Sequence, residues 1–296
     1  MLDQYFTDMV APFGVGASVS IFTPATNGVS SVAAPRMNSN FGNWTKPRGH
    51  TMLFAIIVAS GASGSNGASG LAGTSRNGGV GGTSGAWASV LVPLIFLPET
   101  LYVRCGYGGG RGPAGQPFNQ TGIHCMGEDD NQGYATPLLG SLLTGASPSA
   151  VVGGMMPNAG ISVYQVSDVS LPSNGGTGPA KGGDLFPLSV SRVCGGTGGG
   201  GCGIDNASWP GGNMFTNGPL GPVSGGLVTG GAGLHGTSLM PYFMGLGGTG
   251  GASNGTGTGG RGGNGATGCG GGGGGGGVTG GTGGLGGDGF AILITW

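Results

Sequence analysis

Glycine occurs at every third position from residue 259 to residue 289, and this period constrains the fold more than any other feature of the sequence. Three residues per turn is the period of polyproline II geometry, a left-handed helix without internal hydrogen bonds. Each backbone N–H and C=O must then find a partner on another segment, and neighbouring backbones come close enough only where no Cβ intervenes. The period therefore predicts a layered or hexagonally packed bundle of polyglycine II helices. Six residues at the third position are predicted to point outward: Arg261, Asn264, Thr267, Thr282, Leu285 and Asp288.

Three residues interrupt the doubled glycines of this region, namely Ala266, Cys269 and Val278. A side chain at such a position blocks close approach of a neighbouring backbone. We therefore expect the helix faces there to be exposed or interrupted by turns. Two shorter glycine tracts, at 78–85 and 195–201, show the same rhythm and are predicted to join the same bundle.

The composition limits the classes of function. Of 296 residues, 79 are glycine and only 6% are charged, with a net charge of -1, whereas ordinary domains carry about 25% charged residues. Such a surface offers no electrostatic footprint for nucleic acid or for an anionic membrane. Collagen needs about 15–20% proline, yet no proline follows Pro241. Disorder of the whole chain is disfavoured because 37% of the residues are hydrophobic.

Apolar runs bounded by glycine predict β-strands. The clearest are 51–60 (TMLFAIIVAS), 99–105 and 290–296 (FAILITW). In the last run, Phe290, Ile292, Ile294 and Trp296 alternate with residues of the other face. We predict an all-β fold: irregular, β-sandwich-like strands with a glycine-rich polyglycine II helical bundle and little or no α-helix. The predicted regions are 1–48, a β-rich domain at 49–193 with the first glycine excursion, and a polyglycine II region at 194–296 closed by a C-terminal strand.

No constellation of residues predicts catalysis, so we expect neither an enzyme nor a cofactor or metal. The three histidines, His50, His124 and His235, lie far apart, and the acidic run at 128–130 lacks the spacing of a calcium loop. The cysteines are odd in number and have no CxxC spacing, which favours free thiols packed as small apolar residues; they are Cys105, Cys125, Cys194, Cys202 and Cys269. The N-terminus has no signal-peptide pattern and the apolar runs are too short to span a bilayer, which predicts a protein that starts out cytosolic and soluble.

The return segment LPETLYVRCGYGGG and the closing GGDGFAILITW resemble the glycine-rich virion proteins of tailed bacteriophages. The similarity covers about 50–110 and 194–296 and is greatest to tail proteins and tail-fibre tip adhesins. It implies a structural and adhesive virion component, in a tail fibre, tail tip or spike, assembled in the host cytoplasm. Its partners would be other virion proteins and a host cell-surface receptor, either a glycan or an outer-membrane protein. A homo-oligomer, by default a trimer, is expected, and residues 1–48 would attach it to the virion.

Loops between the rods are the predicted receptor contacts, because aromatic side chains there can stack on sugars or pack against a protein. The selected residues are Trp209 and Phe215, in the passage 206–217, and Tyr242 and Phe243, in the passage 240–244. An equal alternative is that such aromatic residues fill gaps in the core. Two other functions use the same architecture: a capsid decoration or head fibre, and an ice-binding protein, although the irregular third positions argue against a flat ice-binding face.

Overall fold

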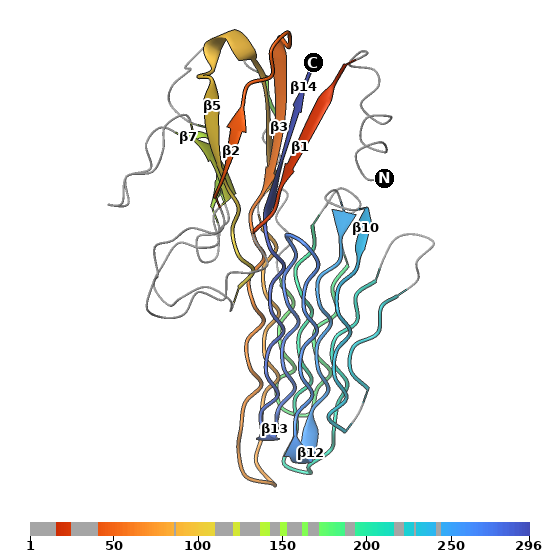
Figure 1. Cartoon of the computed structure of the whole chain (residues 1–296). Helices are drawn as coiled ribbons and strands as arrows, with labels where there is room; N and C mark the ends of the chain where they lie inside the picture. The colour runs from red at the N-terminus through yellow and green to blue at the C-terminus, as the bar shows by residue number, and fades with distance from the viewer. Residues whose placement is uncertain are drawn as a thin grey trace, which may run out of the picture.

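The computed structural model shows a chain divided into two β-sheets at one end and a bundle of long extended segments at the other (Figure 1). The structure describes residues 16–24, 41–85, 87–109, 121–124, 137–142, 149–152, 162–164, 172–186, 193–215, 222–227, 229–240 and 244–296. Within these ranges the regular elements are strands, apart from one short 3-10 helix, η2 (Leu94–Phe96), and no α-helix occurs. The predicted all-β class is thus confirmed for the described part of the chain.

Two antiparallel five-stranded sheets form the first part. The first sheet has the order β1 (Ser18–Phe22), β14 (Phe290–Thr295), β3 (Met52–Val58), β4 (Trp87–Pro93) and β9 (Ser162–Tyr164). The second has the order β2 (Phe41–Thr45), β5 (Thr100–Arg104), β6 (Thr121–His124), β7 (Pro137–Leu142) and β8 (Ser149–Val152). Two small pairs complete the strands: β10 (Ser238–Met240) with β11 (Met244–Gly245), and β12 (Asn254–Thr258) with β13 (Gly277–Thr279). The strands predicted at 51–60, 99–105 and 290–296 are present as β3, β5 and β14.

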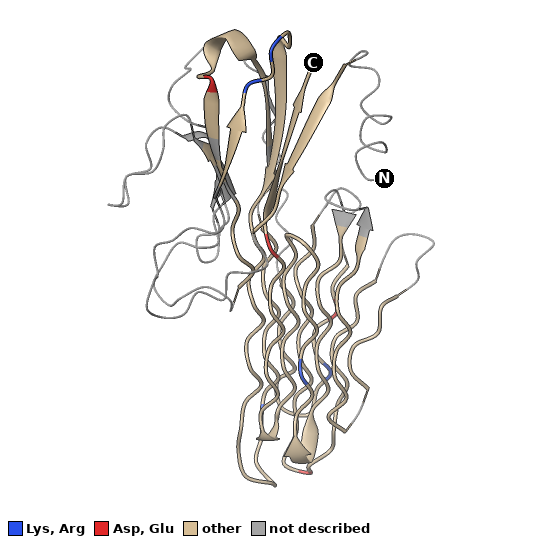
Figure 2. Ribbon diagram, viewed as in Figure 1, with Lys and Arg blue, Asp and Glu red and all other residues tan. Residues whose placement is uncertain are grey.

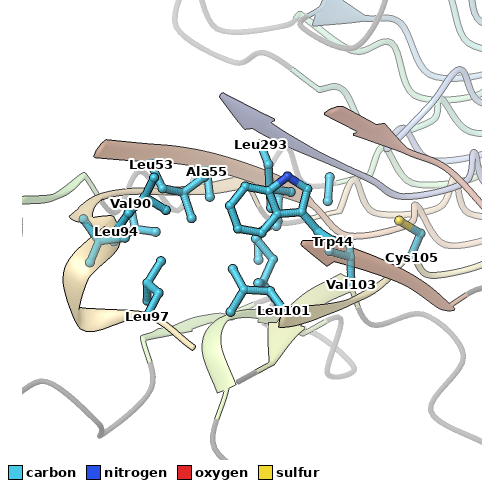
Figure 3. Close-up of a cluster of buried hydrophobic side chains, with 14 residues drawn as sticks. Trp44, Leu53, Ala55, Val90, Leu94, Leu97, Leu101, Val103, Cys105 and Leu293 are labelled. Atoms are coloured by element: carbon cyan, nitrogen blue, oxygen red, sulfur yellow. The ribbon is translucent and has the colours of Figure 1, made fainter. Parts of the chain in front are cut away.

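The core between the two sheets follows from the alternation of side chains along the strands. Leu53 of β3 and Leu293 of β14 point toward Trp44 and Leu101 of the second sheet, and all four are buried in one cluster (Figure 3). The opposite face of β14 carries Phe290 and the isoleucines at 292 and 294, which belong to a second buried cluster. The two faces predicted for FAILITW are therefore confirmed.

The second part is a set of extended segments that bond through their backbones, here called the glycine bundle. Its segments are 61–70, 76–85, 173–176, 180–185, 194–202, 209–215, 223–227, 231–237, 245–254, 259–266, 269–277 and 279–288. Bonding repeats every third residue. The N–H groups of Gly61, Gly64 and Gly67 donate to segment 279–288, whereas those of Ala62, Ser65 and Ala68 donate to segment 76–85. Successive residues thus face different neighbours, and residues three apart face the same one.

Segment 269–277 lies at the centre of a closed ring of other segments. Its N–H groups donate to 61–70, 194–202 and 259–266, and its carbonyls accept from 76–85, 245–254 and 279–288. Each of these six also bonds to the next one around the ring. A Cβ on any glycine from 270 to 277 would lie closer than 3.0 Å to a backbone atom of a neighbour. The longest all-glycine run of the sequence therefore occupies the position where no side chain fits.

Segments 194–202 and 245–254 also lie inside the bundle, and residues 193–203 and 245–253 are all buried. Thr197 is one of the larger residues there, and its hydroxyl takes part in the backbone network. Thr197 Oγ1 donates to the Gly212 carbonyl at 2.7 Å and accepts from the Gly250 N–H at 2.7 Å. A hydroxyl can replace a missing backbone partner, which makes this position compatible with the bundle interior.

The outer surface of the glycine bundle is closed by short polar side chains. Ser65 Oγ accepts from the Val80 N–H at 2.7 Å, and Asn66 Oδ1 accepts from the Gly283 N–H at 2.9 Å. Asn264 Oδ1 accepts from the Leu285 N–H at 3.0 Å. Outer N–H groups without a backbone neighbour are thereby satisfied without charge, and few Lys, Arg, Asp or Glu residues occur along the bundle (Figure 2).

The predicted orientation of the third-position residues is confirmed, since none of the six from Arg261 to Asp288 is buried. The prediction for the interruptions was right for Val278, which is 37% exposed. It was also right for Ala266 and Cys269, which flank the turn at 267–268, although both residues are buried. The reason is that this turn packs beneath the first sheet, where both residues join the cluster of Val58 and Phe290.

Candidate functional site

The chain reverses direction at the end of the glycine bundle remote from the two sheets, where Figure 1 labels β12 and β13. The reversals at this end, here called the distal turns, are 70–76, 177–180, 203–208, 227 with 229–231, and the short paired strands β12 (254–258) and β13 (277–279). Five residues with a left-handed backbone lie in them: Gly73, Gly178, Asn206, Thr229 and Gly230. The tight reversals between closely spaced segments require this conformation.

Three distal turns expose a large aliphatic side chain. Leu71 is 78% exposed, Ile204 is 75% exposed and Leu227 is 72% exposed. The turns of Leu71 and Ile204 adjoin each other, since a Cβ on Gly73 would lie 4.0 Å from the Ile204 carbonyl. Single exposed aliphatic residues are common on proteins, but here they stand on turns fixed by a rigid backbone network, a placement suited to contact with another surface.

Arg76 lies buried among the distal turns, with 1% of its surface exposed. Its Nε donates to the Thr74 carbonyl at 3.1 Å, and its Nη2 donates to Asn206 Oδ1 at 2.8 Å and to the Gly255 carbonyl at 2.9 Å. Asn206 Oδ1 accepts a second bond, from the Gly73 N–H at 2.7 Å. One side chain thus connects the turns 70–76, 203–208 and 254–258.

Of the predicted contact residues, the structure describes Trp209 and Phe215, which lie at opposite ends of one segment. Trp209 begins segment 209–215 beside the distal turns, is 38% exposed, and donates its N–H to Ser253 Oγ at 2.7 Å. Phe215 ends the same segment and stacks on Phe186, with ring centroids 4.6 Å apart. Six residues of extended chain place the two roughly 20 Å apart. Tyr242 and Phe243 lie outside the described residues.

Sequence reasoning selected aromatic residues and missed the exposed aliphatic ones. A local signal was present, because each follows a glycine at the point where a tract ends: GLAG at 70–73, CGID at 202–205 and GGLVTGG at 225–231. An apolar residue in a glycine turn has no core to enter, so its side chain faces outward. The buried arginine had no such signal, since Arg76 and the exposed Arg261 both stand among glycines and small polar residues.

The remaining candidates for chemistry are dispersed. His50 Nδ1 lies 2.9 Å from Thr295 Oγ1, and His235 Nδ1 accepts from the Asn264 N–H at 2.9 Å. Among the described residues, no group of His, Cys, Asp or Glu is arranged to hold a metal ion. The side chain of His124, Cys125 and the acidic run at 128–130 lie outside the described part.

Four cysteines, Cys105, Cys194, Cys202 and Cys269, are free and buried, as predicted. Burial raises the pKa of the Cys105 thiol from 9.0 to about 12, and burial likewise raises the pKa of Cys269, with a smaller contribution from the neighbouring Cys194. A thiol held in its neutral form is a poor nucleophile. Cys105 and Cys269 therefore act as packing residues.

None of the described residues forms a helix of the length and apolarity needed to cross a membrane. Comparison of the chain with protein families finds no match, and comparison with curated proteins finds none either.

Proposed function

We propose that the glycine bundle consists of polyglycine II helices in hexagonal packing, attached to a β-sandwich. Three features support this. The donors repeat every three residues, the segment 269–277 has six bonded neighbours, and the ring around it is closed. A threefold helix directs its N–H groups along three directions and its carbonyls along three others, which is the bonding pattern of that segment.

We further propose that the chain is a structural and adhesive component of a bacteriophage virion, in a tail fibre, tail tip or spike, where it helps to bind a host receptor. The observation that carries this proposal is the exposure of Leu71, Ile204 and Leu227 on turns at the far end of a rigid bundle. Segments of nine residues with a rise of about 3.1 Å hold these turns roughly 28 Å beyond the sheets. The sheets, which include β1 and β2 from the region 1–48, then face the virion, and a trimer is the default assembly for a fibre.

A competition experiment tests the adhesive role. Purified protein is incubated with host cells before addition of the phage that encodes it, and the free phage is counted. The chain should reduce adsorption, and a Leu71→Ser, Ile204→Ser, Leu227→Ser variant should lose most of this effect. The matched control is Ile95→Ser with Phe96→Ser, because these residues of η2 are 83% and 51% exposed at the opposite end of the molecule.

Two outcomes would contradict the proposal. If the wild-type chain does not compete, or if the triple variant competes as well as the control variant, the distal turns are not the contact surface. Gold-labelled antibody against the chain, viewed on intact particles, locates it independently. Label on the tail agrees with the proposal, whereas label on the head identifies a capsid decoration or head fibre instead.

A further inference from the structure

We infer that Arg76 is the positioning residue of three distal turns, 70–76, 203–208 and 254–258, which it holds together as one surface. The inference deepens the proposed function and rests on it only for the role of that surface in adhesion. The first observation is the path of the side chain. The backbone of Arg76 bonds to that of Cys202 in both directions, at 2.9 and 2.8 Å. Its side chain then passes beneath Gly70, where a Cβ would lie 3.2 Å from Arg76 Cγ.

The second observation is that the acceptors of Arg76 come from three different turns. They are the Thr74 carbonyl, the Asn206 side chain and the Gly255 carbonyl. The planar guanidinium presents several donors in a fixed fork. A lysine has a single nitrogen and cannot replace Nε at Thr74 and Nη2 at the other two acceptors together. The geometry therefore requires arginine in particular.

The third observation is that the charge of Arg76 has no carboxylate partner among the described residues, whose ion pairs join Lys46 to Glu99 and Lys181 to Asp184. Its Nη1 atom is buried and has no hydrogen-bond partner. A buried charge without a counter-charge is unfavourable for stability, and apolar residues of similar volume often do as well or better. Stability alone therefore does not explain an arginine here, whereas the fixing of three turns does.

The consequence concerns the exposed aliphatic residues. Leu71 lies three residues before Thr74, and Ile204 lies two residues before Asn206. Asn206 has a left-handed backbone with φ of 58°, and its Oδ1 receives both the Arg76 and the Gly73 donors. The relative position of Leu71 and Ile204 thus depends on a shared bond network centred on Arg76.

Hydrogen exchange of backbone amides, followed by mass spectrometry or NMR, tests the inference without any receptor. Arg76→Met removes the donors at similar length, and Arg76→Lys keeps the charge but loses the fork. In both variants, exchange at the turns 70–76 and 203–208 should rise at least tenfold, while the central segment 269–277 stays protected. The matched control is Arg261→Met, because Arg261 is exposed and bonds to Asn264 of its own segment. In this variant the turns 70–76 and 203–208 should exchange as in the wild type.

Unchanged exchange in Arg76→Met, or full recovery of wild-type exchange in Arg76→Lys, would overturn the inference. If Arg76→Met does not fold, Asn206→Asp provides a second test. Aspartate keeps the shape and tolerates the left-handed backbone, and it supplies the missing counter-charge to Nη2. Its thermal midpoint should rise and its turn exchange should fall; a lower midpoint or faster exchange would count against the inference. Failure of wild-type protein to compete for adsorption would refute the proposed function alone, since the exchange results do not depend on it.

Discussion

Substitution of Gly273 by alanine tests whether the glycine bundle is held by close backbone approach. The added Cβ would lie against the Gly79 carbonyl and 2.9 Å from the Gly199 nitrogen. These two groups bond to each other at 2.8 Å, so the methyl group would enter between segments 76–85 and 194–202 at an existing bond. Gly273 itself donates to the Thr197 carbonyl and accepts from the Gly251 N–H, both at 2.9 Å. No direction around the residue is open for relaxation.

The expected loss of stability follows from these contacts. Overpacking costs about 1–3 kcal/mol, and each buried hydrogen bond left unmade costs about 1–3 kcal/mol more. The lower entropy of the unfolded alanine chain offsets about 0.4–1 kcal/mol. With the middle of each range and one or two bonds broken, Gly273→Ala should lower the free energy of unfolding by about 3–5 kcal/mol, a large part of the roughly 5–15 kcal/mol typical of a domain.

Denaturant unfolding, monitored by the fluorescence of the buried Trp44 and Trp87, measures this loss. Thr282→Ala is the control, because Thr282 is exposed on the neighbouring segment 279–288 and its truncation should change stability by less than about 0.5 kcal/mol. A loss below about 1 kcal/mol for Gly273→Ala would refute the reasoning. It would mean that the segments separate easily and that the central glycines are not required by packing.

Two further predictions concern the thiols and the outer surface of the bundle. The pKa of the Cys105 thiol is about 12 in the folded state, against 9.0 for an ordinary thiol. The contribution of this thiol to the free energy of unfolding is therefore fully present below pH 9 and is lost as the pH rises toward 12. Over that interval the free energy of unfolding should fall by about 1.4 kcal/mol per pH unit from this group; a Cys105→Ala variant with the same slope in a pH titration of stability would contradict this. Asn66→Ala and Asn264→Ala each remove an acceptor from an outer N–H group, which should cost about 0.5–1.5 kcal/mol per site in denaturant unfolding; stabilities equal to that of Thr282→Ala would show that water replaces these side chains without cost.

The sequence has two short-range repeats, the alternation of two in the strands and the glycine period of three. Because both repeats are local, the local geometry of this protein could be predicted from its sequence. Alternation in FAILITW identified the two faces of β14, and the period of three from residue 259 onward identified the residues that point outward. The burial of Ala266 and Cys269 was not predicted. Their burial depends on a sheet assembled from strands far apart in the chain, including β1, β3 and β14, and no local pattern specifies that contact.

The order of segments in the bundle could not be predicted for a related reason. Glycine tracts carry no side chains that distinguish one neighbour from another, so pairings such as Gly273 with Thr197 have no counterpart in the sequence pattern. The sequence does indicate how deeply each segment is buried. The run at 270–277 has no residue other than glycine and is enclosed on all sides, whereas segment 279–288, with Thr282 and Leu285, lies at the outside. Aromatic content alone does not identify contact residues, because it reflects packing as well as binding.

The central position of segment 269–277 has a consequence for synthesis on the ribosome. Five of the six segments around it precede it in the sequence, from 61–70 to 259–266, and β14 likewise enters between β1 and β3, which are made much earlier. At about 5–20 residues per second, the segments 61–70 and 76–85 spend on the order of ten seconds or more before the central segment that bonds to them is made. The earlier segments must leave space for segment 269–277 and for β14 until these are synthesised. Glycine segments expose little apolar surface, so they are well suited to remaining unpaired during that time.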